Sequence, residues 1–156
     1  MEVATINGAQ AVSLGIQLAV SAALVLLMVV LHSVWLVIVS RVLHLNSKRL
    51  KKESVSPSSI LTIGTLGLMI FIIHIVEIVI FAAFYIAIDA ISSLEEALYY
   101  SASAYATLGW TADYFPQSWR LVGALEALVG FVLIGWSTAF MAGKMSELSA
   151  DNEPGQ

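Results

Sequence analysis

Cysteine is absent from this sequence of 156 residues, and charged residues make up only 12% of it. The absence of thiols excludes disulfides and thiolate metal sites, and it leaves no basis for inferring a redox compartment. The scarcity of charge accompanies a hydrophobic content of 59% and a mean hydropathy of +0.89. These values lie far outside the range of soluble domains of this size. The composition therefore predicts a membrane protein.

The sequence also lacks the motifs of common enzyme classes. It has no Gly-rich phosphate loop, no Ser, His and Asp in a plausible catalytic order, and no soluble segment large enough to enclose a substrate. The first hydrophobic segment has no spaced arginines, which excludes a voltage sensor. We therefore expect no enzymatic activity, no organic cofactor and no nucleic-acid partner.

Three hydrophobic segments are present instead, and each is long enough to cross a membrane. Residues 11–40 contain no Asp, Glu, Lys or Arg, residues 60–88 contain two ionisable side chains, and residues 119–143 contain one acidic side chain. At about 1.5 Å per residue, each helix would exceed the roughly 30 Å of the hydrocarbon core. We predict transmembrane helices over residues 11–43, 60–88 and 119–143.

The positive charges set the expected orientation. Residues 44–59, between the first two segments, carry a cluster of Lys and Arg from Lys48 to Lys52, whereas residues 1–10 contain neither residue type. Because basic loops stay in the cytoplasm, the N-terminus is expected outside. The third segment then returns inward, so residues 145–156 are expected to form a cytoplasmic tail.

The region between the second and third segments is predicted to enter the membrane without crossing it. Ser92 or Ser93 can cap a helix whose first turn contains Glu95 and Glu96. A helix of about 14 residues from there would be roughly 21 Å long, which is too short to span. Residues 89–118 should therefore form a re-entrant hairpin. One hairpin cannot surround a pore, so a symmetric oligomer is implied.

The stretch ALYYSASAYATLGW, residues 97–110, resembles the pore helix and filter start of tetrameric potassium channels. The usual sequence in that family is close to ALWWS, followed by four or five variable residues and then TVGYGD. Downstream, WRLVGALEALVGFVLIGWSTAF resembles the inner helix of bacterial two-transmembrane channels, and HIVEIVIFAAFY resembles their outer helix.

The resemblance implies an all-α, potassium-channel-like pore domain over residues 60–144. Its parts would be an outer helix at 60–88, a re-entrant pore helix at 93–107, a filter loop at 107–113 and an inner helix at 119–143. The N-terminal transmembrane helix is an addition to this pattern. The resemblance further implies a homotetramer in a cell membrane, the bacterial inner membrane.

The first half of the filter loop matches the usual sequence of the family. Thr107, Leu108 and Gly109 correspond to the inner half of the filter. In the family, stacked backbone carbonyls of this region replace the hydration shell of an ion. Successive carbonyls that point the same way require positive φ at alternate positions, which glycine adopts most readily.

The second half of the filter loop differs from the usual sequence of the family. Trp110 replaces the usual Tyr, Thr111 the second Gly and Ala112 the Asp. Holding the β-branched Thr111 at positive φ would cost roughly 1–2 kcal/mol per chain and about 4–8 kcal/mol over four chains. We therefore predict that the Thr111 carbonyl turns away, that the outer mouth widens and that discrimination between potassium and sodium is weakened.

Three residues of the pore helix are candidates for supporting the filter. In many family members an aromatic pair braces the filter Tyr, and Tyr99 and Tyr100 occupy these positions here. A bond between the Trp110 indole and a phenol oxygen would replace the original brace. Some members also carry a carboxyl pair behind the filter; the corresponding residues here are Ser103 and Ala112, so that brace is missing.

His74 and Glu77 are three residues apart on one helix face near mid-membrane, where ionisable groups are rare and usually paired. One hypothesis is a metal or proton site completed by His32 or Glu126. The other, which we favour, is an interhelical hydrogen bond that locks the outer helix to the pore helix or inner helix. Glu126 is expected behind the pore helix rather than in the ion path, and no metal ion is expected beyond a monovalent cation in the filter.

Gly130 and Gly135 interrupt the predicted inner helix. In related channels a glycine near this point acts as a gating hinge, whereas glycine in a membrane helix also serves as a close-packing contact. Both roles stay open for both residues. Trp35 and Trp136 are expected to anchor their helices at the membrane interface.

The function that we favour is passive passage of potassium, and of sodium as well, through a homotetrameric pore with weakened selectivity. Two alternatives stay open. One is a non-conducting structural or regulatory homologue, and the other is a membrane ion- or proton-binding protein that uses His74 and Glu77. The expected partners are further copies of the chain and membrane lipids.

Overall fold

The computed structural model describes residues 12–47, 57–109 and 119–150. This part of the chain forms four helices: α1 (Leu14–Ser47), α2 (Pro57–Ala87), α3 (Leu94–Tyr105) and α4 (Arg120–Ala150). No strand occurs among these residues, so the predicted all-α fold is confirmed.

Three of the helices are long and apolar enough to cross a membrane. The qualifying stretches are Leu14–Val42, Ile60–Ala87 and Arg120–Ser146, with 29, 28 and 27 residues. At 1.5 Å per residue, each is about 40 Å long and exceeds the roughly 30 Å hydrocarbon core. The 12 residues of α3 extend only about 18 Å. The three predicted spans and the short helix between the last two are therefore present.

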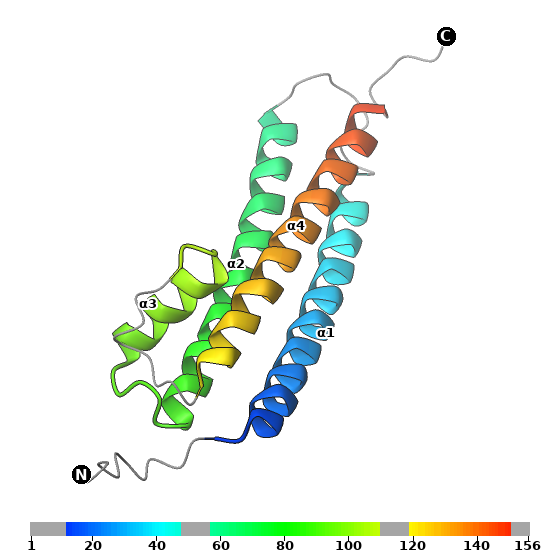
Figure 1. Cartoon of the computed structure of the whole chain (residues 1–156). Coiled ribbons are helices and arrows are strands. Elements are labelled where there is room, and N and C mark those ends of the chain that lie inside the picture. Colours follow the sequence, from blue (N-terminus) through cyan, green and yellow to red (C-terminus); the bar gives the residue numbers. More distant parts are fainter. Residues whose placement is uncertain (1–11, 48–56, 110–118, 151–156) are drawn as a thin grey trace, which may run out of the picture.

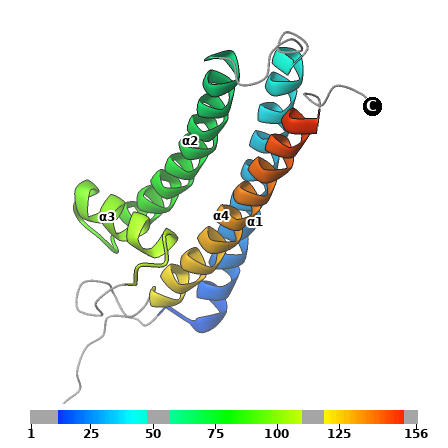
Figure 2. The same ribbon diagram turned by 90° about the horizontal axis from the view of Figure 1, so that it is seen from above.

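The three long helices run alongside one another, and α3 lies beside one half of α2 (Figure 1). In both views α1 and α4 are neighbours over most of their length (Figures 1 and 2). The end of α2 and the start of α4 lie at the same end of the bundle, so the chain between them enters and leaves on one side. The last residue of α3, Tyr105, contacts His74 and Glu77 in the middle part of α2, so α3 reaches about mid-depth.

Several helix ends differ from the predicted ones. α1 continues to Ser47 and α2 begins at Pro57, so the predicted loop at 44–59 is helical at both of its described ends. α4 continues to Ala150, which lies inside the predicted tail at 145–156. The predictions placed the ends where the apolar runs stop, but backbone hydrogen bonding does not require apolar side chains, so a helix can continue beyond the apolar layer. Pro57 suits a first helical position because the N–H that it lacks would have no helical partner there.

The start of α3 agrees with its sequence signals. Ser93 is the N-cap, and its hydroxyl oxygen accepts a hydrogen bond from the Glu96 N–H at 3.5 Å. Glu95 and Glu96 lie in the first turn, where the helix dipole favours negative charge. The predicted capping serine and acidic first turn are confirmed.

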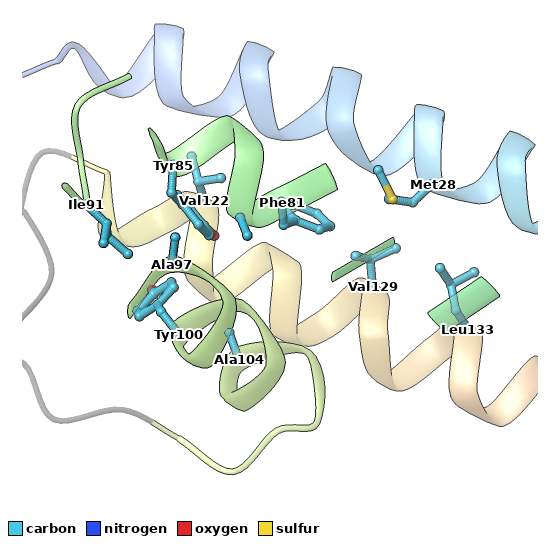
Figure 3. Close-up of a cluster of buried hydrophobic side chains, with 11 residues drawn as sticks. Met28, Phe81, Tyr85, Ile91, Ala97, Tyr100, Ala104, Val122, Val129 and Leu133 are labelled. Atoms are coloured by element: carbon cyan, nitrogen blue, oxygen red, sulfur yellow. The ribbon is translucent and has the colours of Figure 1, made fainter. Parts of the chain in front are cut away.

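A main apolar core fastens α3 to the longer helices. Figure 3 shows side chains from α2, α3 and α4 converging on it, with Met28 reaching in from α1. Ala97 and Ala104 are buried members of this core, and their small side chains let α3 approach its neighbours closely. A second, smaller cluster joins α1, α2 and α4 around three buried residues: Val39, Leu66 and Ile70.

The two tryptophans expected at the membrane interface make contacts inside the bundle. The Trp35 Nε1–H donates to the Met69 carbonyl at 2.8 Å, which links α1 to α2. The Trp136 ring lies beside the His32 ring, with centroids 5.8 Å apart. The polar tip of Trp35 is thus bonded to protein, and its place at the membrane interface stays a prediction.

Candidate functional site

α3 ends in a Schellman motif that positions the first residues of the predicted filter. The Leu108 N–H donates to the Ser103 carbonyl and the Thr107 N–H donates to the Ala104 carbonyl, both at 2.9 Å. This pair of bonds requires a residue in the left-handed region, and Thr107 adopts it with a φ of 58°. The predicted pore helix through residue 107 is therefore too long, because the chain leaves the helix after Tyr105.

Thr107 is consequently strained at a position that glycine usually occupies. A β-branched residue in the left-handed region costs about 1–2 kcal/mol, and such strain persists only where the surrounding structure imposes it. Gly109 also has a positive φ, 83°, and adopts it without that cost. The sequence predicted threonine strain at Thr111, whereas the described residues contain it at Thr107.

Thr107, Leu108 and Gly109 all lie on the exposed side of the chain. The Leu108 side chain is 79% exposed, the highest value among the large apolar side chains that the structure describes. A leucine with so little contact inside its own chain faces lipid, a neighbouring subunit or a pore. Trp110, Thr111 and Ala112 of the predicted filter lie outside the described residues.

Glu77 is fully buried and receives hydrogen bonds from three helices. Nδ1 of His32 in α1 lies 2.9 Å from Oε1, and the hydroxyl of Tyr105 in α3 donates to Oε2. Nδ1 of His74, one turn earlier in α2, lies 3.2 Å from Oε2 and 2.8 Å from the Tyr105 hydroxyl oxygen. We refer to His32, His74, Glu77 and Tyr105 as the imidazole cluster. Its contacts satisfy a carboxylate that would otherwise be costly to bury.

Ser137 extends the imidazole cluster to α4. Its hydroxyl oxygen lies 3.1 Å from Nε2 of His32. A neutral His32 with its proton on Nδ1 donates to Glu77 and accepts from Ser137, so both ring nitrogens are satisfied. All four helices thus meet at one buried carboxylate. His32 and Glu126 were the two candidates to complete a site with His74 and Glu77. His32 contacts Glu77, whereas Glu126 belongs to a different group.

Glu126 is as deeply buried as Glu77, but hydroxyl groups rather than imidazoles bond to its carboxylate. The hydroxyls of Tyr85 in α2 and Ser101 in α3 each donate to its carboxylate at 2.5 Å. The Ser101 hydroxyl also lies 2.9 Å from the Ile78 carbonyl oxygen. We refer to Tyr85, Ser101 and Glu126 as the hydroxyl cluster. It joins α2, α3 and α4.

Two glycines of α4 make room for tyrosines of α3. A Cβ added at Gly130 would overlap the Tyr105 carbonyl oxygen and would lie 3.0 Å from the carbonyl carbon. A Cβ at Gly123 would overlap the Tyr100 hydroxyl and would lie 3.1 Å from Cζ of that ring. A Cβ at Gly135 would meet no atom within 4 Å. Within this chain, Gly130 is therefore a close-packing contact, whereas Gly135 has free space around it.

The candidate filter-supporting side chains face different surroundings. Tyr100 is buried, and its ring packs edge-on against Tyr85 with centroids 5.1 Å apart. Tyr99 is 68% exposed, as expected for adjacent residues that point about 100° apart around a helix. Ser103 is buried and supplies a carbonyl to the C-terminal cap of α3. The proposed brace to Trp110 lies outside the described residues.

Sequence reasoning missed five residues that form these contacts: Tyr85, Ser101, Tyr105, Gly123 and Ser137. Tyrosine and serine are common in membrane helices, so their presence alone gave no signal. The rule that a buried ionisable group needs partners would have directed a search for donors on the other helices. The seven-residue spacing of Gly123 and Gly130 also places both on one helix face, which is typical of a close helix contact.

Comparison with known proteins gives one match. Residues 73–147 match a family model described as "Ion channel". The matched segment contains the second half of α2, all of α3 and most of α4, and it excludes α1. Neither the curated proteins nor the solved structures gave a match. Together with the three membrane-spanning helices, the matched segment supports a membrane protein with an ion-channel domain.

Proposed function

We propose that the chain is one subunit of a homotetrameric pore that passes potassium and sodium ions with weak selectivity. One observation carries this proposal: the ion-channel match covers a half-helix that ends at mid-depth in an exposed Thr-Leu-Gly. The resemblance of residues 97–110 to the pore helix and filter start of potassium channels supplies the tetramer and the class of ion.

The direction of α3 favours cations at the middle of the membrane. The C-terminal end of a helix carries the equivalent of roughly half a negative charge. This end of α3 lies at the depth of His74 and Glu77, near the middle of α2. A partial negative charge at that depth lowers the cost of bringing a cation into a region of low dielectric.

The exposed surfaces of the single chain suit assembly around an axis. Leu108 and an apolar stretch of α4 that includes Leu128, Phe131 and Val132 have little contact within the chain. Symmetric copies would cover part of this surface and bring equivalent Thr-Leu-Gly segments to a common path. Lipid would cover the rest.

Weak selectivity follows from the residues after Gly109. Thr107 already accepts the strain of a positive φ. A second strained threonine at position 111 would add a similar cost of about 1–2 kcal/mol in every subunit. We infer that the outer half of the filter avoids this conformation, so that fewer carbonyl rings surround the ion. Fewer consecutive sites discriminate less well between potassium and sodium.

We also propose an orientation in a bacterial inner membrane. Residues 1–10 would lie outside, and the basic residues from Lys48 to Lys52 and the segment 145–156 would lie in the cytoplasm. This orientation places α3 and the filter on the outer side, because α3 lies at the same end of the bundle as the start of α1.

Gly109→Ala tests the use of the Thr-Leu-Gly segment. Alanine at a φ of 83° is strained, so we expect the segment to rearrange and potassium flux into proteoliposomes to fall at least about tenfold. Gly67→Ala is the matched control, because a Cβ there meets no atom within 4 Å and the backbone is helical. Its flux should equal that of the unaltered protein.

Absence of flux distinguishes the proposal from its main alternative. If oligomers of the unaltered chain pass neither potassium nor sodium, and the double variant Thr111→Gly, Ala112→Asp is equally silent, the chain is a non-conducting homologue. Equal flux through the Gly109→Ala variant and the unaltered protein would show that ions do not pass the Thr-Leu-Gly segment.

A further inference from the structure

We propose that the imidazole cluster binds one divalent transition-metal ion of the zinc class. His32, His74 and Glu77 would be ligands, and Tyr105 would be the fourth. One ligand atom from each of the first three lies within 4.8 Å of the others. These residues come from α1 and α2, and Tyr105 adds α3, so the ion would join three helices at mid-depth.

The distances within the cluster are close to those between ligands of one ion. Nδ1 of His32 lies 2.9 Å from Oε1 of Glu77, and Nδ1 of His74 lies 2.8 Å from the Tyr105 hydroxyl oxygen. In a tetrahedral zinc site with bonds of about 2.0–2.1 Å, neighbouring ligand atoms lie about 3.3 Å apart. These short pairs would open by a few tenths of an ångström to admit the ion, and the wider pairs among His32, His74 and Glu77, which lie within 4.8 Å, would close around it.

The chemistry of the donors selects the class of metal. Two imidazole nitrogens with carboxylate and phenol oxygens suit zinc and its neighbours in the first transition row. Calcium and magnesium prefer sites built from oxygen ligands. A chain without cysteine also offers no thiolate for soft ions such as copper(I).

A divalent ion would supply a countercharge for the buried carboxylate, as a protonated imidazole also would. Within the described part of the chain, only His32 and His74 form ion-pair contacts with Glu77. Neutral imidazoles would leave the buried carboxylate without a countercharge, which is costly in a dry interior. A divalent ion bound to the Glu77 carboxylate and to Tyr105 as a phenolate gives a site of net charge zero. The phenolic proton is released to solvent on binding.

The surroundings of His32 fit a metal ligand. Coordination through Nδ1 requires the proton to move to Nε2, which then donates to the Ser137 hydroxyl oxygen 3.1 Å away. Serine accepts as readily as it donates, so the change of tautomer breaks no hydrogen bond. A hydrogen bond to the second ring nitrogen is the usual way in which proteins orient a metal-binding histidine.

From the sequence we favoured a hydrogen-bonded lock over a metal or proton site completed by His32 or Glu126. The structure brings a second imidazole and a phenol to the same carboxylate, which completes a four-donor set. Metal binding at this set does not depend on ion conduction, so it is tested without flux.

The test is a titration of the chelator-treated full chain in detergent with Co²⁺, which replaces zinc and has visible absorption bands in tetrahedral sites. We expect one equivalent per chain to produce tetrahedral bands and Zn²⁺ to abolish them. Absence of these bands at saturating Co²⁺, or binding with no defined stoichiometry, overturns the proposal without any variant.

Variants then assign the ligands. His32→Gln and His74→Gln should weaken Zn²⁺ binding by more than the roughly 10–100-fold typical of losing an outer hydrogen bond. Unchanged affinity in both would overturn the assignment. Tyr105→Phe should shift the Co²⁺ bands, and an unchanged spectrum would contradict the fourth ligand.

Two controls match these variants. His44→Gln removes an imidazole from the same helix about 18 Å along its axis from His32. Glu126→Gln removes an equally buried carboxylate that has hydroxyl partners instead. Both should bind Zn²⁺ like the unaltered chain; a loss in either control as large as in His32→Gln would overturn the site.

Discussion

The imidazole cluster and the hydroxyl cluster are two versions of one arrangement. Each buries a carboxylate that accepts a hydrogen bond from α3, and each lies near a tyrosine of α3 that packs on a glycine of α4. Tyr105, which donates to Glu77, packs against Gly130. Tyr100, whose ring packs against Tyr85 of the hydroxyl cluster, lies against Gly123. The clusters differ in their donors and in whether they reach α1.

The two clusters therefore show two roles of buried polar groups: one fastens α3 to α2 and α4, and the other also joins α1 to the end of α3. The hydroxyl cluster uses Tyr85 and Ser101, which donate to Glu126 and fasten the middle of α3. The imidazole cluster lies at the C-terminal end of α3, shortly before Thr107, and His32 brings α1 into contact with it. The helix that lies outside the ion-channel match is thus joined to the segment that we propose as the start of the filter.

Removing each carboxylate should give the largest contrast between the clusters. Glu77→Leu removes the acceptor of His32 and leaves Tyr105 and His74 to bond to each other, so we expect a loss of about 3–5 kcal/mol in the free energy of unfolding. Glu126→Leu should cost about 1–3 kcal/mol, because Ser101 keeps the Ile78 carbonyl as an acceptor. Unfolding of purified protein by denaturing detergent, followed by circular dichroism, measures both.

If Glu126→Leu were more destabilising than Glu77→Leu, the claim that the imidazole cluster contributes more to stability would be wrong. In that case the hydroxyl cluster, and not the contact with α1, would dominate the stability of the bundle.

The two glycines provide a second contrast. A Cβ at Gly130 overlaps the backbone of Tyr105, so the end of α3 must move, and we expect Gly130→Ala to cost about 3 kcal/mol. At Gly123 the Cβ meets the tip of the Tyr100 side chain, which can rotate away, so about 1–2 kcal/mol is expected. Thermal unfolding of both variants shows which of them loses more stability.

Gly135→Ala is the matched control, since a Cβ there meets no atom within 4 Å. It should leave stability unchanged or raise it by up to about 1 kcal/mol, because alanine is the better helix former. Equal losses at all three positions would indicate a general requirement for glycine in α4 rather than contacts with α3.

The smallest effect is expected at Ser137. Ser137→Ala removes one hydrogen bond to Nε2 of His32 and should cost about 1 kcal/mol in unfolding free energy. The neighbouring Thr138 bonds only to the Ile134 carbonyl of its own helix, so Thr138→Ala should change stability by less than about 0.5 kcal/mol. Indistinguishable variants would mean that Ser137 does not support His32.

The features that the sequence predicted correctly depend on local or strongly periodic signals. The three spans follow from uninterrupted apolar runs, and the start of α3 follows from Ser93 and the acidic turn after it. The ends of α1 and α4 were missed because helix formation continues past the apolar layer.

The polar clusters depended on contacts that sequence alone could not place. His32 reaches Glu77 only because α1 packs beside α4 and α2, and no sequence signal fixed that packing. The left-handed Thr107 is likewise imposed by the cap of α3 rather than favoured by threonine itself.

The most direct test of the proposed function is the reversal potential of the reconstituted protein with potassium on one side of a bilayer and sodium on the other. We predict a current whose reversal potential lies near zero, because an outer filter without its second glycine discriminates weakly. Thr111→Gly combined with Ala112→Asp should move it toward the potassium equilibrium potential. A reversal potential already at that value in the unaltered protein would contradict weak selectivity.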